Sequence, residues 1–318
     1  MKNMKKFSLV LLLAFSTFVS FSIAEETDEK WEKHKSEKFH KLTEEERKVI
    51  ADALPDAPTA TAAKPRKVLL FYRCNGYIHS SIPWANAAVE EMATKTGAFT
   101  VEITDEYEVF TKENLANYDC VLLNNASHME FPKPEQMNAF MDFVIEGKGL
   151  AGIHAAGDNF QRHPDCLALI GGEFGGHPWG SGGTWAFKLN DPAHPLNAAF
   201  EGKGFWFKDE IYQYKPESYV GTDTLRVLLS LDMTKDKVSS KIDDGPREVP
   251  VSWIRTAGEG RVFYTNLGHN ESTYRDPAVM RHMLDGIQYA IGDLAADATA
   301  TSKAPATKPA LAPEEQPK

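Results

Sequence analysis

Short apolar runs alternate with longer amphipathic segments through the first half of the folded part of the chain. The runs are nearly unbroken, which is typical of strands buried on both faces of a sheet; they are residues 67–72, 99–104, 119–126 and 149–155. The segments between them favour helices, and proline or glycine marks several of their ends; these are residues 82–97, 134–147 and 158–169. The alternation predicts an α/β fold, a mainly parallel sheet with helices on both faces.

The second half of the chain has strand-like runs that follow one another more closely. They are residues 184–189, 225–231, 249–255 and 261–267. The sequence "TAGEG" joins the last two, and a short glycine-containing turn of this kind is typical of a β-hairpin. Residues 277–292 then form an amphipathic helix that begins with proline and ends at glycine. We therefore expect a β-hairpin addition to the parallel sheet.

The first 24 residues have the pattern of a secretory signal peptide. Three lysines precede the apolar run "FSLVLLLAFSTFVSF", and "SIA" ending at Ala24 is a small-residue cleavage site. The alternative is an uncleaved membrane anchor, but the run is short for a span and contains several serines and threonines. We expect cleavage, a secreted or periplasmic protein, and no membrane attachment afterwards.

Two further segments differ in composition from the predicted domain. Residues 25–65 begin as a charged arm and continue as an Ala/Pro-rich linker, and residues 294–318 have a similar Ala/Pro/Thr character. Such composition buries too little apolar surface to offset the entropy lost on ordering. The sequence predicts one folded domain over residues 66–293, followed by a disordered tail that can be removed.

Charge and motifs narrow the classes of partner. The net charge is −10, and removal of the signal lysines makes the chain more acidic, which argues against nucleic acid and anionic lipid. The glycine-rich stretch 171–183 lacks the ending of a phosphate-binding loop, so no nucleotide is expected. This stretch is either a flexible connection or a segment that covers the substrate.

Cys74, Cys120 and Cys166 are too sparse for a disulfide framework, although one pair could form.

Histidines follow several of the predicted strands. His79 comes after the first strand, His128 after the third, His154 at the end of the fourth and His269 after the last. Ligands bind beyond the carboxyl ends of the strands in open parallel sheets, so these side chains are expected along one edge. A lone histidine is more often a structural group, and the spacing matches no compact metal motif such as HExxH.

Other candidate residues come from the connections. His177 lies in the glycine-rich stretch and precedes a proline. The alternative to a functional role is that it is only a turn residue. Glu210 stands beside Asp209 in "FKDEIY", a carboxylate pair flanked by aromatic residues that is unusual for a surface loop. His163 and His282 lie on predicted helices and are expected to be structural.

Seven ordered segments resemble the ThuA-like family, which is named for trehalose utilisation. They are "GYIHSSIP", "GLAGIHAAGD", "LIGGEFGGHPW", "DPAHPL", "KDEIYQY", "VPVSWIRTAGEGRVFYTNLGHN" and "RHMLDGIQYAIG". The resemblance covers nearly all of residues 66–293. It implies a flavodoxin-like fold similar to that of class I glutamine amidotransferases.

The comparison with those amidotransferases also concerns the tight turn after the fourth strand. Their turn carries a catalytic cysteine, and their last strand leads into a His-x-Glu. Here His154 takes the nucleophile's place, while His269 and Glu271 stand where the other two members would be. Glutaminase activity is therefore disfavoured, with Cys74 as the only reserve nucleophile. A histidine at this turn can bind a metal or move protons instead.

The family resemblance implies carbohydrate as the partner, and two classes of function stay open. The first is an enzyme, a hydrolase, lyase or isomerase acting on a keto-sugar or glycoside. Its acid–base groups, or its ligands for Zn²⁺ or a similar divalent ion, would be His79, His154, His269 and Glu210. Candidate substrate contacts are His177, Asp158, Trp179, Tyr212 and Asn270, with Trp185 and Trp206 as further rings for a sugar or for packing. The second class is a non-catalytic sugar-binding or scaffold domain that retains the pocket.

Overall fold

A computed structural model describes residues 28–243 and 248–316 of the 318-residue chain. The predicted signal peptide lies outside this range. The chain divides into two compact units, residues 1–40 and residues 41–318, and in the first of them residues 28–38 are helical. Among the described helices, none is both long and apolar enough to cross a membrane.

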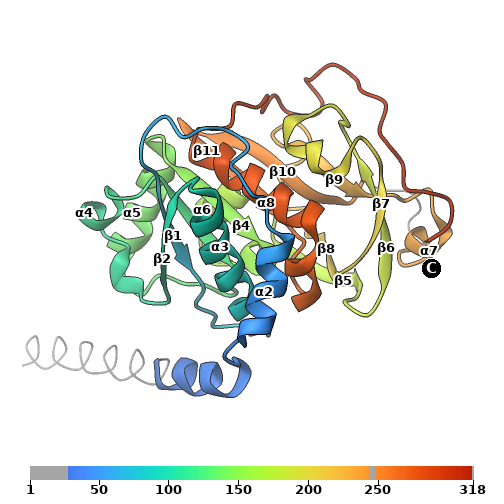
Figure 1. Cartoon of the computed structure of the whole chain (residues 1–318). Helices are drawn as coiled ribbons and strands as arrows, with labels where there is room; N and C mark the ends of the chain where they lie inside the picture. Colours follow the sequence, from blue (N-terminus) through green and yellow to red (C-terminus); the bar gives the residue numbers. More distant parts are fainter. Residues whose placement is uncertain (1–27, 244–247, 317–318) are drawn as a thin grey trace, which may run out of the picture. The chain divides into compact units, whose positions relative to one another are not determined.

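The second unit is built on a nine-stranded sheet in the order β2-β1-β3-β4-β11-β10-β9-β6-β7 (Figure 1). The first five strands are parallel, and the rest pair antiparallel. The α/β prediction is thereby confirmed, including the β10–β11 hairpin. The strands are β1 (Lys67–Phe71), β2 (Thr100–Thr104), β3 (Cys120–Asn124), β4 (Gly149–Ile153), β6 (Thr184–Leu189), β7 (Phe205–Lys208), β9 (Arg226–Leu231), β10 (Pro250–Ala257) and β11 (Gly260–Thr265).

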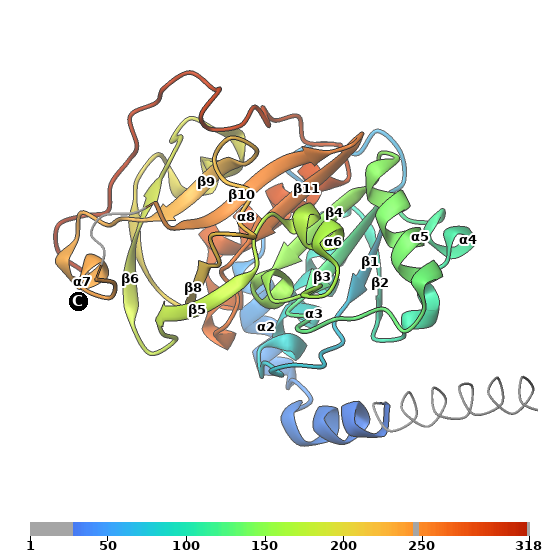
Figure 2. The ribbon, with the colours of Figure 1, turned by 180° about the vertical axis from the view of Figure 1, so that it is seen from behind.

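Helices cover both faces of the parallel strands because alternate strand residues point to opposite sides. In β1, Val68 and Leu70 pack in the core cluster that holds the first group of helices, α2 (Glu44–Ala53), α3 (Ile82–Thr96) and α8 (Pro277–Ala290). Leu69 and Phe71 pack in the opposite cluster, with α5 (Pro134–Ile145) and α6 (Pro164–Ile170). Figure 2 shows this second face. This unit also contains two short helices, α4 (Lys112–Leu115) and α7 (Asp236–Ser239).

The structure differs from the sequence-based elements around the glycine-rich connection. The helix expected from Asp158 begins at Pro164, and the strand expected to reach Ala155 ends at Ile153, where a 3₁₀ turn of residues 154–157 begins. Part of the connection is a strand, β5 (Phe174–Trp179), which pairs with β8 (Ile211–Tyr214) in a separate two-stranded sheet. Strand propensity does not predict β5, because its sequence is rich in glycine and also contains histidine and proline. Its extended conformation depends on pairing with β8.

The segments expected to be a free arm and tail make specific contacts with the domain. Gln288 of α8 accepts a hydrogen bond from the Thr59 backbone N–H at 2.7 Å. Ala310 forms a β-bridge with Leu189, and the Trp206 indole N–H donates to the Pro313 carbonyl at 2.9 Å. Composition misses these contacts because they are made largely by backbone groups, which alanine- and proline-rich chain still carries.

We expect a chain that ends at Asp293 to melt several degrees below the full chain, because it loses the bridge at Leu189 and the hydrogen bond of Trp206. Differential scanning calorimetry of both lengths measures the change. Equal melting temperatures would instead support the expectation of a free tail.

His282 of α8 is fully buried, and its Nδ1 lies 2.7 Å from the Leu196 carbonyl oxygen. Burial lowers the pKa of His282 to about 4. The unfolded chain takes up this proton near pH 6.5, so the free energy of unfolding should fall between pH 6.5 and 4, by up to about 3 kcal/mol. Denaturant titrations of His282→Gln should show a shallower pH dependence than the wild type. The exposed His40→Gln is the matched control, and equal slopes in all three chains would contradict the prediction.

Candidate metal and catalytic centre

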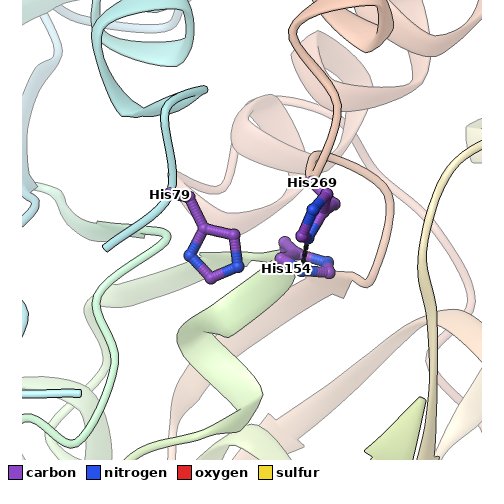
Figure 3. Close-up of side chains that lie close together, drawn as sticks. All are labelled: His79, His154 and His269. Carbon is purple, nitrogen blue, oxygen red and sulfur yellow. Dashed lines mark hydrogen bonds between the residues drawn. The ribbon is translucent and has the colours of Figure 1, made fainter. Parts of the chain in front are cut away.

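Three histidines meet at the carboxyl edge of the parallel strands. His79 follows β1, His154 follows β4, and His269 follows β11 (Figure 3). One nitrogen from each ring lies within 4.8 Å of the other two, and the ring centroids are 4.9–5.1 Å apart. The topology brings together residues that are far apart in the sequence, as the strand-end argument predicts.

His154 occupies a strained turn and is oriented by its surroundings. Its φ of +46° is in the left-handed region, where a non-glycine residue is uncommon. Its Nδ1 lies 2.7 Å from the Asn266 carbonyl oxygen, which can only accept, so Nδ1 carries the hydrogen. The Tyr264 hydroxyl also donates to the His154 carbonyl at 2.7 Å. The Nε2 lone pair of His154 is therefore the one available to the cluster.

His79 and His154 are both buried neutral imidazoles. Burial and the neighbouring His269 lower the pKa of His79 to about 3. Burial, reinforced by His79 and His269, holds the pKa of His154 well below its usual range. The Nδ1 atom of His79 is buried without a hydrogen-bond partner among the described residues. Neutral imidazole with an unused nitrogen is the form that binds a metal.

Glu210 adds a carboxylate to the three rings. Its Oε1 lies 3.2 Å from His269 Nδ1 and 3.7 Å from His154 Nε2. His269 Nδ1 also lies 3.3 Å from His154 Nε2, so these two nitrogens and Glu210 Oε1 are close to one another. His177 approaches from β5 and places Nδ1 3.6 Å from Glu210 Oε2, with its side chain 55% exposed.

Asp209 holds this arrangement together, a role that sequence reasoning missed. Its fully buried carboxylate accepts from the backbone N–H groups of Gly268 at 2.7 Å and Asn270 at 3.0 Å, on either side of His269. It also accepts from the Glu210 N–H at 3.0 Å and the Thr273 hydroxyl at 2.9 Å. Burial raises the pKa of Asp209 to about 6, and these donors act in the opposite direction. The adjacent pair in "KDEIY" was the signal that could have found it.

The remaining candidates divide into those near the cluster and those outside it. The Tyr212 ring is buried with its centroid 4.5 Å from that of His154, so it supports the histidine. Trp179 is fully buried and donates to the Val238 carbonyl, which leaves no surface for a substrate. Asp158 lies 3.3 Å from His128 Nε2, and this pair is separate from the three-histidine group.

A polar pocket of about 430 Å³ opens beside His269. Its lining contains Asn270, whose side-chain amide donates to the carbonyls of Ser181 and Lys208 at 3.0 and 3.1 Å. The other lining residues are Ser80, Ser181, Gly182, Lys208, His269, Glu271 and Ser272. Glu271 thus belongs to the pocket, while Glu210 is the carboxylate in contact with His269.

The donor set fits a transition metal. Three imidazoles and one carboxylate suit Zn²⁺ or a similar ion, and one nitrogen of each ring lies within 4.8 Å of the other two. His79, His154 and His269 would hold the ion, and Glu210 would be either a fourth ligand or a base beside it. The group is equipped for acid–base chemistry and for polarising an oxygen atom.

The cysteines are poorly placed to act as nucleophiles. All three are free and buried, and burial raises the pKa of the Cys74 thiol to about 12. We expect the chain to release no ammonia from glutamine and Cys74 to resist iodoacetamide at pH 7, because thiolate is the nucleophile. Glutamine-dependent ammonia release that Cys74→Ser abolishes would contradict both expectations.

Comparisons with known proteins agree with the fold. A ThuA-like protein from Bacteroides uniformis has a TM-score of 0.58 and 22% identity, covering 73% of this chain and 94% of that one. A second, from Parabacteroides merdae, has a TM-score of 0.57 and 20% identity, covering 72% and 91%. A search of curated proteins finds no match. The family described as "ThuA: Trehalose utilisation" matches residues 67–290, and the chain therefore belongs to the ThuA family.

Proposed function

We propose that this protein is a metal-dependent enzyme of carbohydrate metabolism that acts on a keto-sugar or its glycoside. The observation that carries the proposal is the convergence of His79, His154 and His269 with Glu210 at one point. A domain that only binds sugar has no need of several buried imidazoles aimed at each other. Membership of a trehalose-utilisation family supports the substrate class.

The first chemical step proposed is removal of a proton next to the carbonyl carbon. Glu210 takes this proton, and the electron pair of the broken C–H bond moves towards the carbonyl oxygen as an enolate. A bound divalent ion would supply electrophilic stabilisation of the negative charge on that oxygen. This step is shared by lyases and isomerases acting beside a ketone.

His177 is suited to the second proton transfer. Its side chain is half exposed, and it contacts Glu210 Oε2, whereas His154 and His269 contact Oε1. We propose that His177 donates a proton to the departing or rearranging oxygen. The buried His79 and His154 are poor candidates for this role, because their lowered pKa values keep them neutral.

The location proposed for this activity is the periplasm or the exterior of the cell. The support is the pattern of residues 1–24, which has a basic start, an apolar run and a small-residue cleavage site. Mass spectrometry of the exported protein should give a chain that begins near Glu25. Recovery of an intact Met1 would contradict this location.

The activity is tested with glycosides and 3-keto-glycosides, before and after metal removal by a chelator. Activity on a keto-sugar substrate that chelation removes and Zn²⁺ or another divalent ion restores is the expected result. Glu210→Gln should lose turnover, while Glu130→Gln, a control outside the cluster, should retain it. Activity unaffected by either chelation or Glu210→Gln would contradict the proposed chemistry. Metal-independent sugar binding without turnover would favour the non-catalytic alternative.

A further inference from the structure

We propose that Tyr77 and the polar pocket beside His269 form a subsite for the neutral pyranose ring of a glycoside. The apolar face of the ring would lie on Tyr77, and its hydroxyl groups would enter the pocket. This inference rests on the proposed function and specifies where its substrate binds.

Tyr77 is a large aromatic side chain left open at the rim of the histidine cluster. It is 64% exposed, and its ring centroid is 4.7 Å from that of His79 and 6.4 Å from that of His269. A single exposed aromatic is ordinary on a protein surface, but this one borders the three histidines. Tyrosine combines an apolar face with a polar end, which suits a sugar ring.

The backbone around Tyr77 is fixed, so the ring is presented from a stable segment. The Ser127 hydroxyl donates to the Tyr77 carbonyl at 2.7 Å. The Asn75 and Gly76 backbone N–H groups donate to the Ser127 carbonyl at 2.9 and 3.2 Å. A ligand that binds Tyr77 therefore has little ordering of the backbone to offset.

Three of the other aromatic candidates are buried and cannot take this role. Trp179 is fully buried, and Tyr212 is only 3% exposed beneath His154. Trp185 is also buried, with its indole N–H donating to the Asp209 carbonyl at 3.0 Å. Tyr77 is the aromatic ring at the cluster that offers a face to solvent among these candidates.

The pocket supplies the chemistry that sugar hydroxyl groups require. Three serine hydroxyls can both donate and accept, and the Asn270 carboxamide has its nitrogen engaged, so its oxygen is the group left to accept. Lys208 and Glu271 contribute one positive and one negative charge. Mixed donors and acceptors with balanced charge fit a neutral polyol better than a phosphorylated or acidic sugar.

His269 connects the subsite with the reacting groups. It lines the pocket, lies beside Tyr77, and contacts Glu210 through Nδ1 at 3.2 Å. A ring held between Tyr77 and the pocket is thus placed next to the proposed base. Binding and chemistry would then share the side chain of His269.

Isothermal titration of the chelator-treated full chain with methyl α-glucoside and trehalose tests the subsite without the metal. The wild type should show saturable binding of at least one of these sugars. Tyr77→Ala should weaken it about tenfold or more, while Tyr77→Phe should retain it within about threefold, because phenylalanine keeps the aromatic face. Ile145→Ala, an exposed apolar residue at the end of α5, is the matched control and should bind like the wild type.

Four results would overturn the inference. They are no saturable binding of either sugar, unchanged affinity in Tyr77→Ala, loss in Tyr77→Phe as large as in Tyr77→Ala, and tighter binding of glucose 6-phosphate than of methyl α-glucoside. Because the protein is free of metal, Tyr77-dependent binding would support the subsite even if the metal chemistry fails. Conversely, metal-dependent activity together with unchanged sugar affinity in Tyr77→Ala would support the proposed function and contradict the subsite.

Discussion

A chain in which His269 is replaced by alanine is expected to bind Zn²⁺ at least about a hundredfold more weakly than the wild type and to lose turnover. The replacement removes one of three converging nitrogens, and even partners that only orient a ligand are worth about 10–100-fold in metal affinity. His269 is the best member for this test because its side chain is 18% exposed, whereas those of His79 and His154 are buried. Its removal should therefore leave the melting temperature within a few degrees of the wild type.

The control for His269→Ala is His128→Ala. His128 follows β3 at the same edge of the sheet, but it pairs with Asp158 outside the three-histidine group. Competition titrations with a zinc-binding dye should show wild-type affinity for His128→Ala. Equal zinc affinity in the wild type and in His269→Ala would contradict the role assigned to His269.

Replacement of Asp209 should damage both stability and the centre. Asp209→Ala leaves three backbone N–H groups and the Thr273 hydroxyl without their buried acceptor, which should cost about 3 kcal/mol or more. For a domain of this size, that loss lowers the melting temperature by roughly 10 °C. Asp209→Asn keeps the volume but replaces one accepting oxygen with an amide donor. We expect it to fold and to bind zinc about 10–100-fold more weakly, because the segment carrying His269 is no longer fixed.

Asp232 provides a matched buried carboxylate whose hydrogen-bond donors are Thr234 and Ala312 rather than the segment that carries His269. It is fully buried and accepts from Thr234 and from the Ala312 N–H at 3.0 Å. Asp232→Asn should lower stability, as measured by calorimetry, without changing zinc affinity. If Asp209→Asn and Asp232→Asn had the same effect on both quantities, Asp209 would be a structural residue only.

The parallel half of the fold follows from local pattern. Buried parallel strands are continuous apolar runs, so β1, β3 and β4 are recognisable without tertiary information. The strand β5 is not, because its glycines and His177 acquire an extended conformation only by pairing with β8. The tail is missed for a similar reason, since Ala310 is held by a bridge to Leu189 rather than by its own composition.

The site is predictable to the extent that topology fixes it. His79, His154 and His269 could be placed together because each follows a strand that ends at the same edge. The sequence shows Asp209 as one of an adjacent carboxylate pair. Its role depends on backbone N–H groups whose directions cannot be predicted from the sequence. The prediction of aromatic contacts from the sequence was wrong for Trp179, and it left out Tyr77. Residue type predicted a tryptophan contact, whereas burial excludes Trp179 and exposure favours Tyr77.

The most direct test of the central claim is anomalous diffraction at the zinc edge from crystals of the full chain loaded with one equivalent of Zn²⁺. We expect a single strong peak about 2 Å from one nitrogen each of His79, His154 and His269. Absence of a peak between these rings, or a peak only at another place on the protein, would contradict the claim that the three histidines form a metal centre.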